Sequence, residues 1–244
     1  MIDIVEDFLA AFDRSGRQGG QPQLVPTRLA AALVEVLPVD GAGLGLFAGS
    51  GLRVPIGASC QDSITAERSQ FTVGQGPCVE AHYRHVPVRG TAAVMATSWP
   101  VYHCELVSQT PFRSVVALPL TGVLARMATL DLLFLSPQAA ADLDLTPVHL
   151  LCLETTEILL DWEVFTDGVD DTQLGPQWSN TPAGGGRHQV MIAAGMIVDR
   201  LGVEVRDALA LLRGHAWTTG STADDLAHRL VDRSVDPAEL DPAS

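Results

Sequence analysis

The chain contains no lysine, so all fifteen of its basic residues are arginine. This absence excludes a phosphate-binding loop with its lysine, a Schiff-base lysine and a lysine general base. Aromatic residues make up only 5% of the 244 residues, which argues against an aromatic-rich cofactor site. The sequence has no GxSxG motif. We therefore predict no enzyme activity, no catalytic residue and no cofactor.

Cysteine and long hydrophobic runs are also scarce. The four cysteines, at positions 60, 78, 104 and 152, have no CxxC spacing, and the N-terminus opens with acidic residues rather than with a basic and then an apolar region. No window reaches the apolar length of a membrane span. We expect a cytoplasmic protein with reduced thiols and no membrane partner.

Five cysteine and histidine side chains are of the type that binds metal ions. They are Cys78, His82, His85, His103 and Cys104. Cys78 and His82 would share a helical face, but no second pair has a standard ligand spacing. We predict buried cysteines and surface histidines, and no metal site.

Length and composition indicate one medium-sized domain and one small one. The chain is 47% hydrophobic and carries a formal net charge of −14. Glycine, proline and acidic residues without periodicity are typical of a linker over 166–186. We divide the rest into an N-terminal helical segment (1–24), a front domain (25–165), a helical module (187–236) and a tail (237–244).

The helical module has three segments with apolar residues at helical spacing. The stripes are Val190, Ala194, Ile197, Val198 and Leu201, then Val205, Ala208, Leu209, Leu212 and Ala216, then Ala223, Leu226, Ala227, Leu230 and Val231. Ser221 and Thr222 precede Asp224 and Asp225, which is a good N-cap signature for the third helix. A bundle of three short helices is too small for an active-site cleft and is suited to binding.

The same module resembles an ANTAR domain. The residues that carry the resemblance are Ala193–Met196, Leu201–Val203, Asp207–Arg213, His215–Trp217 and Leu226–Ala227, in the order of the family pattern. ANTAR domains are three-helix RNA-binding modules of bacterial antitermination regulators. The resemblance implies binding of RNA hairpins in leader transcripts by a homodimer, in which each module engages one hairpin of a tandem pair.

Seven residues of the module are predicted to contact RNA. They are Arg200, Arg206, Arg213, His215, Trp217, Arg229 and Arg233. Arg206 and Arg213 are seven positions apart on the second helix, and Arg229 and Arg233 are four apart on the third, so each pair should project from one face. Such a face would attract RNA even though nine acidic residues accompany six arginines after residue 186.

Each of these side chains also has a structural interpretation. The arginines would instead pair with Asp207, Asp225 or Asp232. Trp217 would either stack on an unpaired base or fill the end of the bundle.

The front domain shows short apolar segments separated by glycine and proline. We expect strands over 41–47, 53–59, 86–89, 114–120 and 129–134, a helix over 27–37 and a long apolar helix over 146–165. This order predicts an α+β fold with an antiparallel sheet flanked by helices. The 146–165 helix is apolar on two sides, which fits either a dimer seam or a buried helix of the domain.

The front domain resembles a GAF domain, the ligand-sensing fold of many bacterial regulators. The residues that carry the resemblance are Val39–Gly43, Gly74–Cys78, Trp99–Pro100, Arg113–Val115 and Leu118–Leu120. Together with the ANTAR resemblance, this spans about residues 25–236 and implies a GAF–ANTAR regulator of transcription antitermination, of the actinobacterial type. The resemblance also implies an effector signal that passes through the 146–165 helix and the linker.

A small-molecule ligand is expected in a pocket of the front domain. Strand residues including Phe47 would line it, and Trp99, Tyr102 and Arg113 would lie near its rim. Arg113 would pair with an anionic ligand or form a structural ion pair.

Two other functions fit the sequence. A DNA-binding helix-turn-helix protein also has three helices, but three or four residues join its two principal helices, whereas the interval from His215 to Ser221 predicts a longer turn. The other is a small-molecule or redox sensor that acts on a protein partner, which the acidic charge would permit.

Overall fold

A five-stranded antiparallel sheet forms the centre of the front domain, with strand order β2-β1-β5-β4-β3. The computed structural model describes residues 2–16, 24–48, 52–161 and 187–241. The strands are β1 (Gly41–Ala48), β2 (Leu52–Ala58), β3 (Val88–Gly90), β4 (Ser114–Pro119) and β5 (Ala128–Phe134). The predicted α+β class and antiparallel sheet are confirmed.

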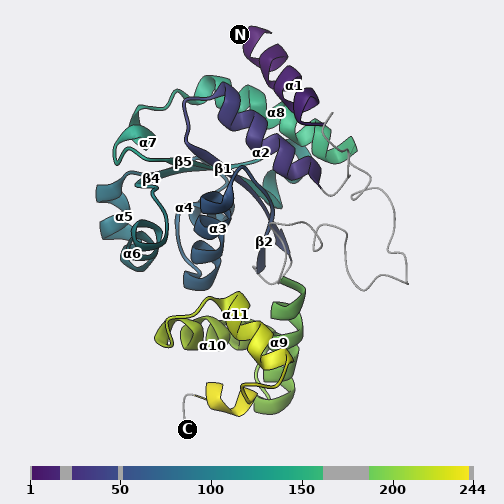
Figure 1. Ribbon diagram of the computed structural model, residues 1–244, viewed down its shortest axis with the longest axis vertical. Helices are drawn as coiled ribbons and strands as arrows, with labels where there is room; N and C mark the ends of the chain where they lie inside the picture. The colour runs from purple at the N-terminus through teal and green to yellow at the C-terminus, as the bar shows by residue number, and fades with distance from the viewer. Residues whose placement is uncertain (1, 17–23, 49–51, 162–186, 242–244) are drawn as a thin grey trace.

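Helices cover both faces of this sheet (Figure 1). One face packs against α2 (Val25–Val36) and α8 (Leu145–Asp161), and α1 (Ile2–Gly16) packs on these two helices. The other packs against α3 (Gln61–Val73), α4 (Pro77–Arg84), α5 (Ala92–Ser98) and α6 (Pro100–Gln109). Two short elements, η2 (Gly122–Arg126) and α7 (Ala139–Asp142), lie before and after β5.

The alternation of side chains along β5 separates two cores. Leu130 and Leu132 point into the core with α1, α2 and α8, whereas Leu133 belongs to the core with α3 to α6. Asp131 has the same parity as Leu133 and therefore lies on the α3 side of the sheet. This places a carboxylate inside an apolar layer.

The apolar helix predicted over 146–165 corresponds to α8, and the part of the segment after Asp161 lies outside the described residues. Val148, Leu151 and Leu159 are fully buried in the core with α1 and α2. This burial agrees with the interpretation of α8 as a buried helix of the domain.

The C-terminal part is a bundle of α9 (Arg187–Leu201), α10 (Val205–Thr218) and α11 (Ala223–Val231). A short helix, η5 (Pro237–Leu240), follows where a tail was predicted, and it buries Leu240 against the bundle. The predicted linker, 166–186, lies outside the described residues. None of the described helices is both long and apolar enough to cross a membrane.

Candidate functional site

Charged and polar side chains are buried between the sheet and α3. Arg53 of β2 forms an ion pair with Glu67 of α3, and its Nη2 lies 3.2 Å from Oδ2 of Asp131 on β5. Gln70 donates to that same Asp131 oxygen at 3.0 Å, and its own Oε1 accepts the backbone N–H of Cys78 at 3.0 Å. All five residues are at most 2% exposed. We call them the buried charge cluster.

Two glycines of β1 provide the room for this cluster. A Cβ atom at Gly43 would collide with the carboxylate of Glu67, and one at Gly45 would lie 2.7 Å from Cζ of Arg53. Glycine at these positions lets side chains from α3 and β2 lie directly on the strand. The glycine-rich run of β1 therefore allows close packing here.

Burial dominates the acid–base behaviour of the cluster. It raises the pKa of Asp131, although Arg53 and the hydrogen bond from Gln70 act in the opposite direction. Burial also raises the pKa of Cys78 well above its ordinary value. Because the thiolate is the reactive form, this cysteine is not activated as a nucleophile. Within the described ranges no three cysteine, histidine or acidic side chains gather in a way that would hold a metal ion.

Several polar atoms of this region are buried without a hydrogen-bond partner among the described residues. They are Nε of Arg53, Oδ1 of Asp131 and Oγ1 of Thr129, which is the β5 neighbour of Gly45. Unsatisfied buried polar atoms are rare in proteins, because most buried polar groups are hydrogen-bonded to protein or to ordered water. The buried charge cluster is therefore a candidate recognition site of the front domain.

The residues predicted to line a sensing pocket lie on the same side of the sheet, but not at a rim. Tyr102 of α6 is fully buried and Trp99, at the junction of α5 and α6, is 8% exposed, because both side chains pack in the core between these helices and the sheet. Phe47 stacks on His82, with 3.7 Å between the ring centroids. Arg113 donates to two backbone carbonyl oxygens of the loop before β4. The rim position predicted for Trp99 and Tyr102 is wrong, and the Arg113 guanidinium is engaged by the backbone.

Sequence reasoning did not identify the buried charge cluster. Arg53 and Asp131 each stand within an apolar strand, in the sequences LRVPIGA and ATLDLLF. A charged residue inside a buried strand requires a buried partner of opposite charge. Arg53 and Asp131 within apolar strands were therefore the feature of the sequence that indicated a buried ion pair. The partner Glu67 is not adjacent in sequence to either residue, so only the fold reveals it.

The last turn of α3 contacts the C-terminal bundle, which lies at that end of the front domain (Figure 1). Phe71 of α3 and Val54 of β2 are buried in the hydrophobic core of the bundle. The Arg213 guanidinium of α10 lies over the Phe71 ring, with Cζ 4.6 Å from the centroid. The Thr72 hydroxyl accepts the backbone N–H of Ala223 at 3.1 Å. One helix thus supplies side chains to the buried charge cluster and also packs on the bundle.

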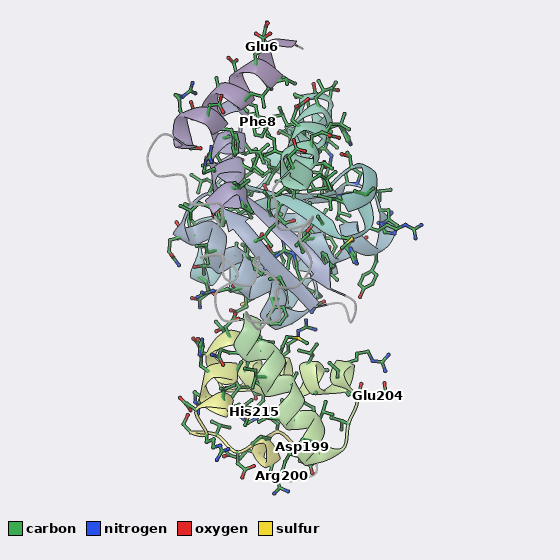
Figure 2. All side chains as sticks on the ribbon, turned by 90° about the vertical axis from the view of Figure 1, so that its right-hand side faces the viewer. Glu6, Phe8, Asp199, Arg200, Glu204 and His215 are labelled. Atoms are coloured by element: carbon green, nitrogen blue, oxygen red, sulfur yellow. The ribbon has the colours of Figure 1, made fainter. Side chains whose placement is uncertain are left out.

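The arginines predicted to form one RNA-binding face are divided by this contact. Arg213 packs on the front domain, and burial lowers its pKa. Arg206 is two turns earlier on α10, is 81% exposed and lies 3.5 Å from Asp207. Arg200 lies 3.8 Å from Asp236, at the end of the bundle farthest from the sheet (Figure 2). The expectation that Arg206 and Arg213 share an open surface is wrong, because α3 occupies the position of Arg213.

The other residues predicted to contact RNA lie on α10, on α11 and just after the end of α11. Arg229 is exposed on α11, whereas Arg233 is exposed beyond the end of that helix, with φ of 63°. These two arginines therefore do not share a helical face as predicted. Trp217 is 41% exposed and lines a cleft against α3, so it does not fill the end of the bundle. His215 is half-buried.

The turn between α10 and α11 is shorter than predicted. Helix α10 continues through Thr218, and α11 begins at Ala223, which leaves the four residues Thr219–Thr222 between them. Turns of this length also join the two principal helices of helix-turn-helix proteins. The predicted difference in turn length is therefore wrong and does not exclude a DNA-binding module.

Comparison with known proteins found no matching family model and no matching curated protein. Among solved structures, the chain is similar to the GAF domain of a phosphoenolpyruvate-protein phosphotransferase from Coxiella burnetii, with 13% identity and a TM-score of 0.45 over 64% of this chain and 90% of that one. It is also similar to the GAF domain of the phosphoenolpyruvate-protein phosphotransferase from Acinetobacter, with 12% identity and a TM-score of 0.44 over 70% of this chain and 100% of that one.

Proposed function

We propose that the protein is a signal-responsive regulator in which a GAF-type front domain controls an ANTAR-type bundle that binds hairpin RNA. The output would be a change in transcription termination or in translation of the bound transcript. The observation that carries this proposal is the double role of α3, which contributes Glu67 and Gln70 to the buried charge cluster and packs Phe71 on the bundle. A change at the cluster is thereby linked to the disposition of the bundle.

Features of the bundle support RNA as its partner. The small residues of the family pattern, including Ala193, Ala194 and Ala208, are buried in its core. Arg200, Arg206, Arg229 and Arg233 remain exposed. Exposed guanidinium groups bind phosphates and release counterions, which drives association with a polyanion even on an acidic protein.

The test uses transcripts selected from the source cell by the full-length protein. Reversing two exposed charges, with Arg206→Glu plus Arg229→Glu, should lower affinity for the selected hairpin RNA at least about tenfold and reduce the salt slope by about two. The matched control is Arg84→Glu plus Arg126→Glu, which makes the same charge change on exposed positions of the front domain. Equal affinity and salt slope in the two double variants would contradict an RNA surface on the bundle.

DNA binding is the second candidate, because the Thr219–Thr222 turn has helix-turn-helix length. Gel shifts with the selected hairpin and with duplex DNA of the same sequence separate the two. Preference for the duplex would replace RNA by DNA in the proposal. If neither nucleic acid binds, both proposals fail and the alternative of a sensor that acts on a protein partner is favoured.

A homodimer is part of the proposed mode of action, since each bundle would engage one hairpin of a tandem pair. Sedimentation of the protein with a one-hairpin and with a two-hairpin RNA measures this. We expect one bundle per hairpin, and a single chain bound to the tandem RNA would contradict the dimer.

A further inference from the structure

A cleft of about 480 Å³ lies between the front domain and the bundle. Helices α3 and α6 form one wall, and the end of α10, the following turn and the start of α11 form the other. Small-molecule sites have volumes of this order and occur preferentially where two domains meet. The cleft is separate from the buried charge cluster, because different residues of α3 line it.

Opposite charges line the cleft without pairing with one another. Arg68 of α3 contributes a guanidinium group, and Glu105 of α6 and Asp225 of α11 contribute carboxylates. Among the ion pairs of the described residues, none joins Arg68 to an acidic side chain. Its Nε is buried and has no hydrogen-bond partner there. Arg68 is half-buried, and its Nε is a donor of the kind that proteins normally satisfy with a hydrogen bond.

Uncharged side chains of the cleft can also donate or accept hydrogen bonds. Ser69 is 6% exposed, and its hydroxyl takes part in none of the hydrogen bonds of the described residues. Gln109 adds an amide, and Trp217 adds a partly exposed indole ring. This lining is suited to a polar ligand, because almost all of its side chains can donate or accept hydrogen bonds.

We propose that this cleft binds a small zwitterion, namely a free amino acid or a close analogue. Arg68 would hold the carboxylate through parallel N–H donors, and Glu105 with Asp225 would hold the ammonium group. The indole face of Trp217 offers a further contact to the cation or to an apolar side chain. A ligand with both charges satisfies both walls at once, whereas an anion or a cation alone would leave one set of charges unpaired.

Binding has a consequence for the arrangement of the molecule. Because the two walls belong to different parts of the chain, an occupied cleft favours the arrangement in which the bundle is docked on α3. It would also cover Trp217, one of the residues predicted to contact RNA. The binding site itself does not depend on the proposed RNA function, so either can fail without the other.

The test is thermal unfolding of the full-length protein with each of the common L-amino acids added separately. At least one should raise the unfolding temperature by about 3 °C when present at about ten times its dissociation constant. Arg68→Ala and Glu105→Gln should each weaken its binding at least about tenfold. Arg126→Ala and Glu157→Gln, at exposed positions of the front domain, should leave the binding unchanged.

Two analogues of the active amino acid complete the experiment. The amine without the carboxylate and the acid without the ammonium should each bind at least about tenfold more weakly. Circular dichroism of the unliganded variants verifies that Arg68→Ala and Glu105→Gln remain folded. If a variant is unfolded, titration calorimetry of the wild type with the two analogues tests the proposal without it. The proposal is overturned if no amino acid shifts the transition, if both cleft variants bind normally, or if one analogue binds as well as the zwitterion.

Discussion

Arg53 is the cation that compensates two buried carboxylates in the buried charge cluster. Removing one partner of a buried ion pair costs about 3–5 kcal/mol, because the charge left behind is uncompensated. We expect Arg53→Met to lower the free energy of unfolding by about this amount in urea denaturation. The matched control is Arg126→Met at an exposed position of η2, where a change below about 0.5 kcal/mol is expected. Similar values for the two variants would contradict the compensating role of Arg53.

Asp131 gives the stability of the protein a distinct pH dependence. Its pKa is raised in the folded state, so the folded chain holds this proton at pH values where the unfolded chain has released it. The bound proton therefore stabilises the folded state fully at pH values below the ordinary pKa of 3.8. This stabilisation, and with it the free energy of unfolding, decreases as pH rises from 3.8 through the raised pKa of the folded state.

Asp131→Asn removes this titration. Urea denaturation at a series of pH values measures the free energy of unfolding of both proteins. Relative to the wild type, the variant should become more stable as pH rises between the two pKa values, and the difference should be constant above them. Asp142→Asn, at an exposed site, is the control. A slope of opposite sign would show that the Arg53 interaction outweighs burial.

The sequence identified single residues well where their role depends on local periodicity, and less well where it depends on distant partners. Ala208 and Leu212 were expected in the bundle core, and both are fully buried. Arg213 was expected on a surface that binds RNA, because it lies seven positions after Arg206 and should project from the same helical face. The spacing is compatible with the structure, but the surface it faces belongs to α3, which the local sequence of α10 does not reveal.

At the scale of elements, apolar segments predicted the five strands, α2 and α8, and apolar residues at helical spacing predicted the three bundle helices. Helix α3 was not predicted, because its inner face is polar. The residues that it buries include Glu67 and Gln70, which belong to the buried charge cluster. Ser63 is also buried, and its hydroxyl contacts Ser59 and Cys60. A helix that buries polar side chains lacks the apolar stripe on which recognition of an amphipathic helix depends.

Strand β1 and helix α10 respond oppositely to the same substitution. Gly43→Ala places a methyl group against the Glu67 carboxylate, whereas a Cβ atom at Gly214 of α10 meets nothing within 4 Å. Overpacking costs about 1–3 kcal/mol. Alanine in place of glycine inside a helix stabilises by about 0.5–1 kcal/mol. Urea denaturation should therefore show a destabilised Gly43→Ala and a stabilised Gly214→Ala, and stabilisation by both would contradict the close packing on β1.

At the scale of the whole molecule, the sequence predicted two parts but not the contact between them. We expected the signal to pass through the 146–165 helix and the linker, and the linker lies outside the described residues. The structure instead brings α3 directly against α10 and α11, where Thr72 and Ala223 are separated by 151 positions. No periodicity reports a contact of this range, since each helix pattern describes only its own faces.

Arg213 is the side chain whose change should release the bundle from the front domain. Its guanidinium lies over Phe71 and beside Gly74, the C-cap of α3, where the helix dipole carries partial negative charge. Arg213→Glu removes the cation–π contact and adds repulsion at that end. A combined loss of about 2 kcal/mol shifts the equilibrium between docked and released bundles roughly thirtyfold.

Small-angle X-ray scattering of the full-length protein measures this release as an increase in the radius of gyration. Hydrogen exchange adds a local measure, because the Ala223 amide loses its bond to the Thr72 hydroxyl when the bundle separates. Arg206→Glu is the matched control, with the same charge change on the same helix at a position 81% exposed and away from α3. We expect expansion and faster exchange only in Arg213→Glu. Equal behaviour of the two variants would mean that net charge, and not the contact with α3, sets the position of the bundle.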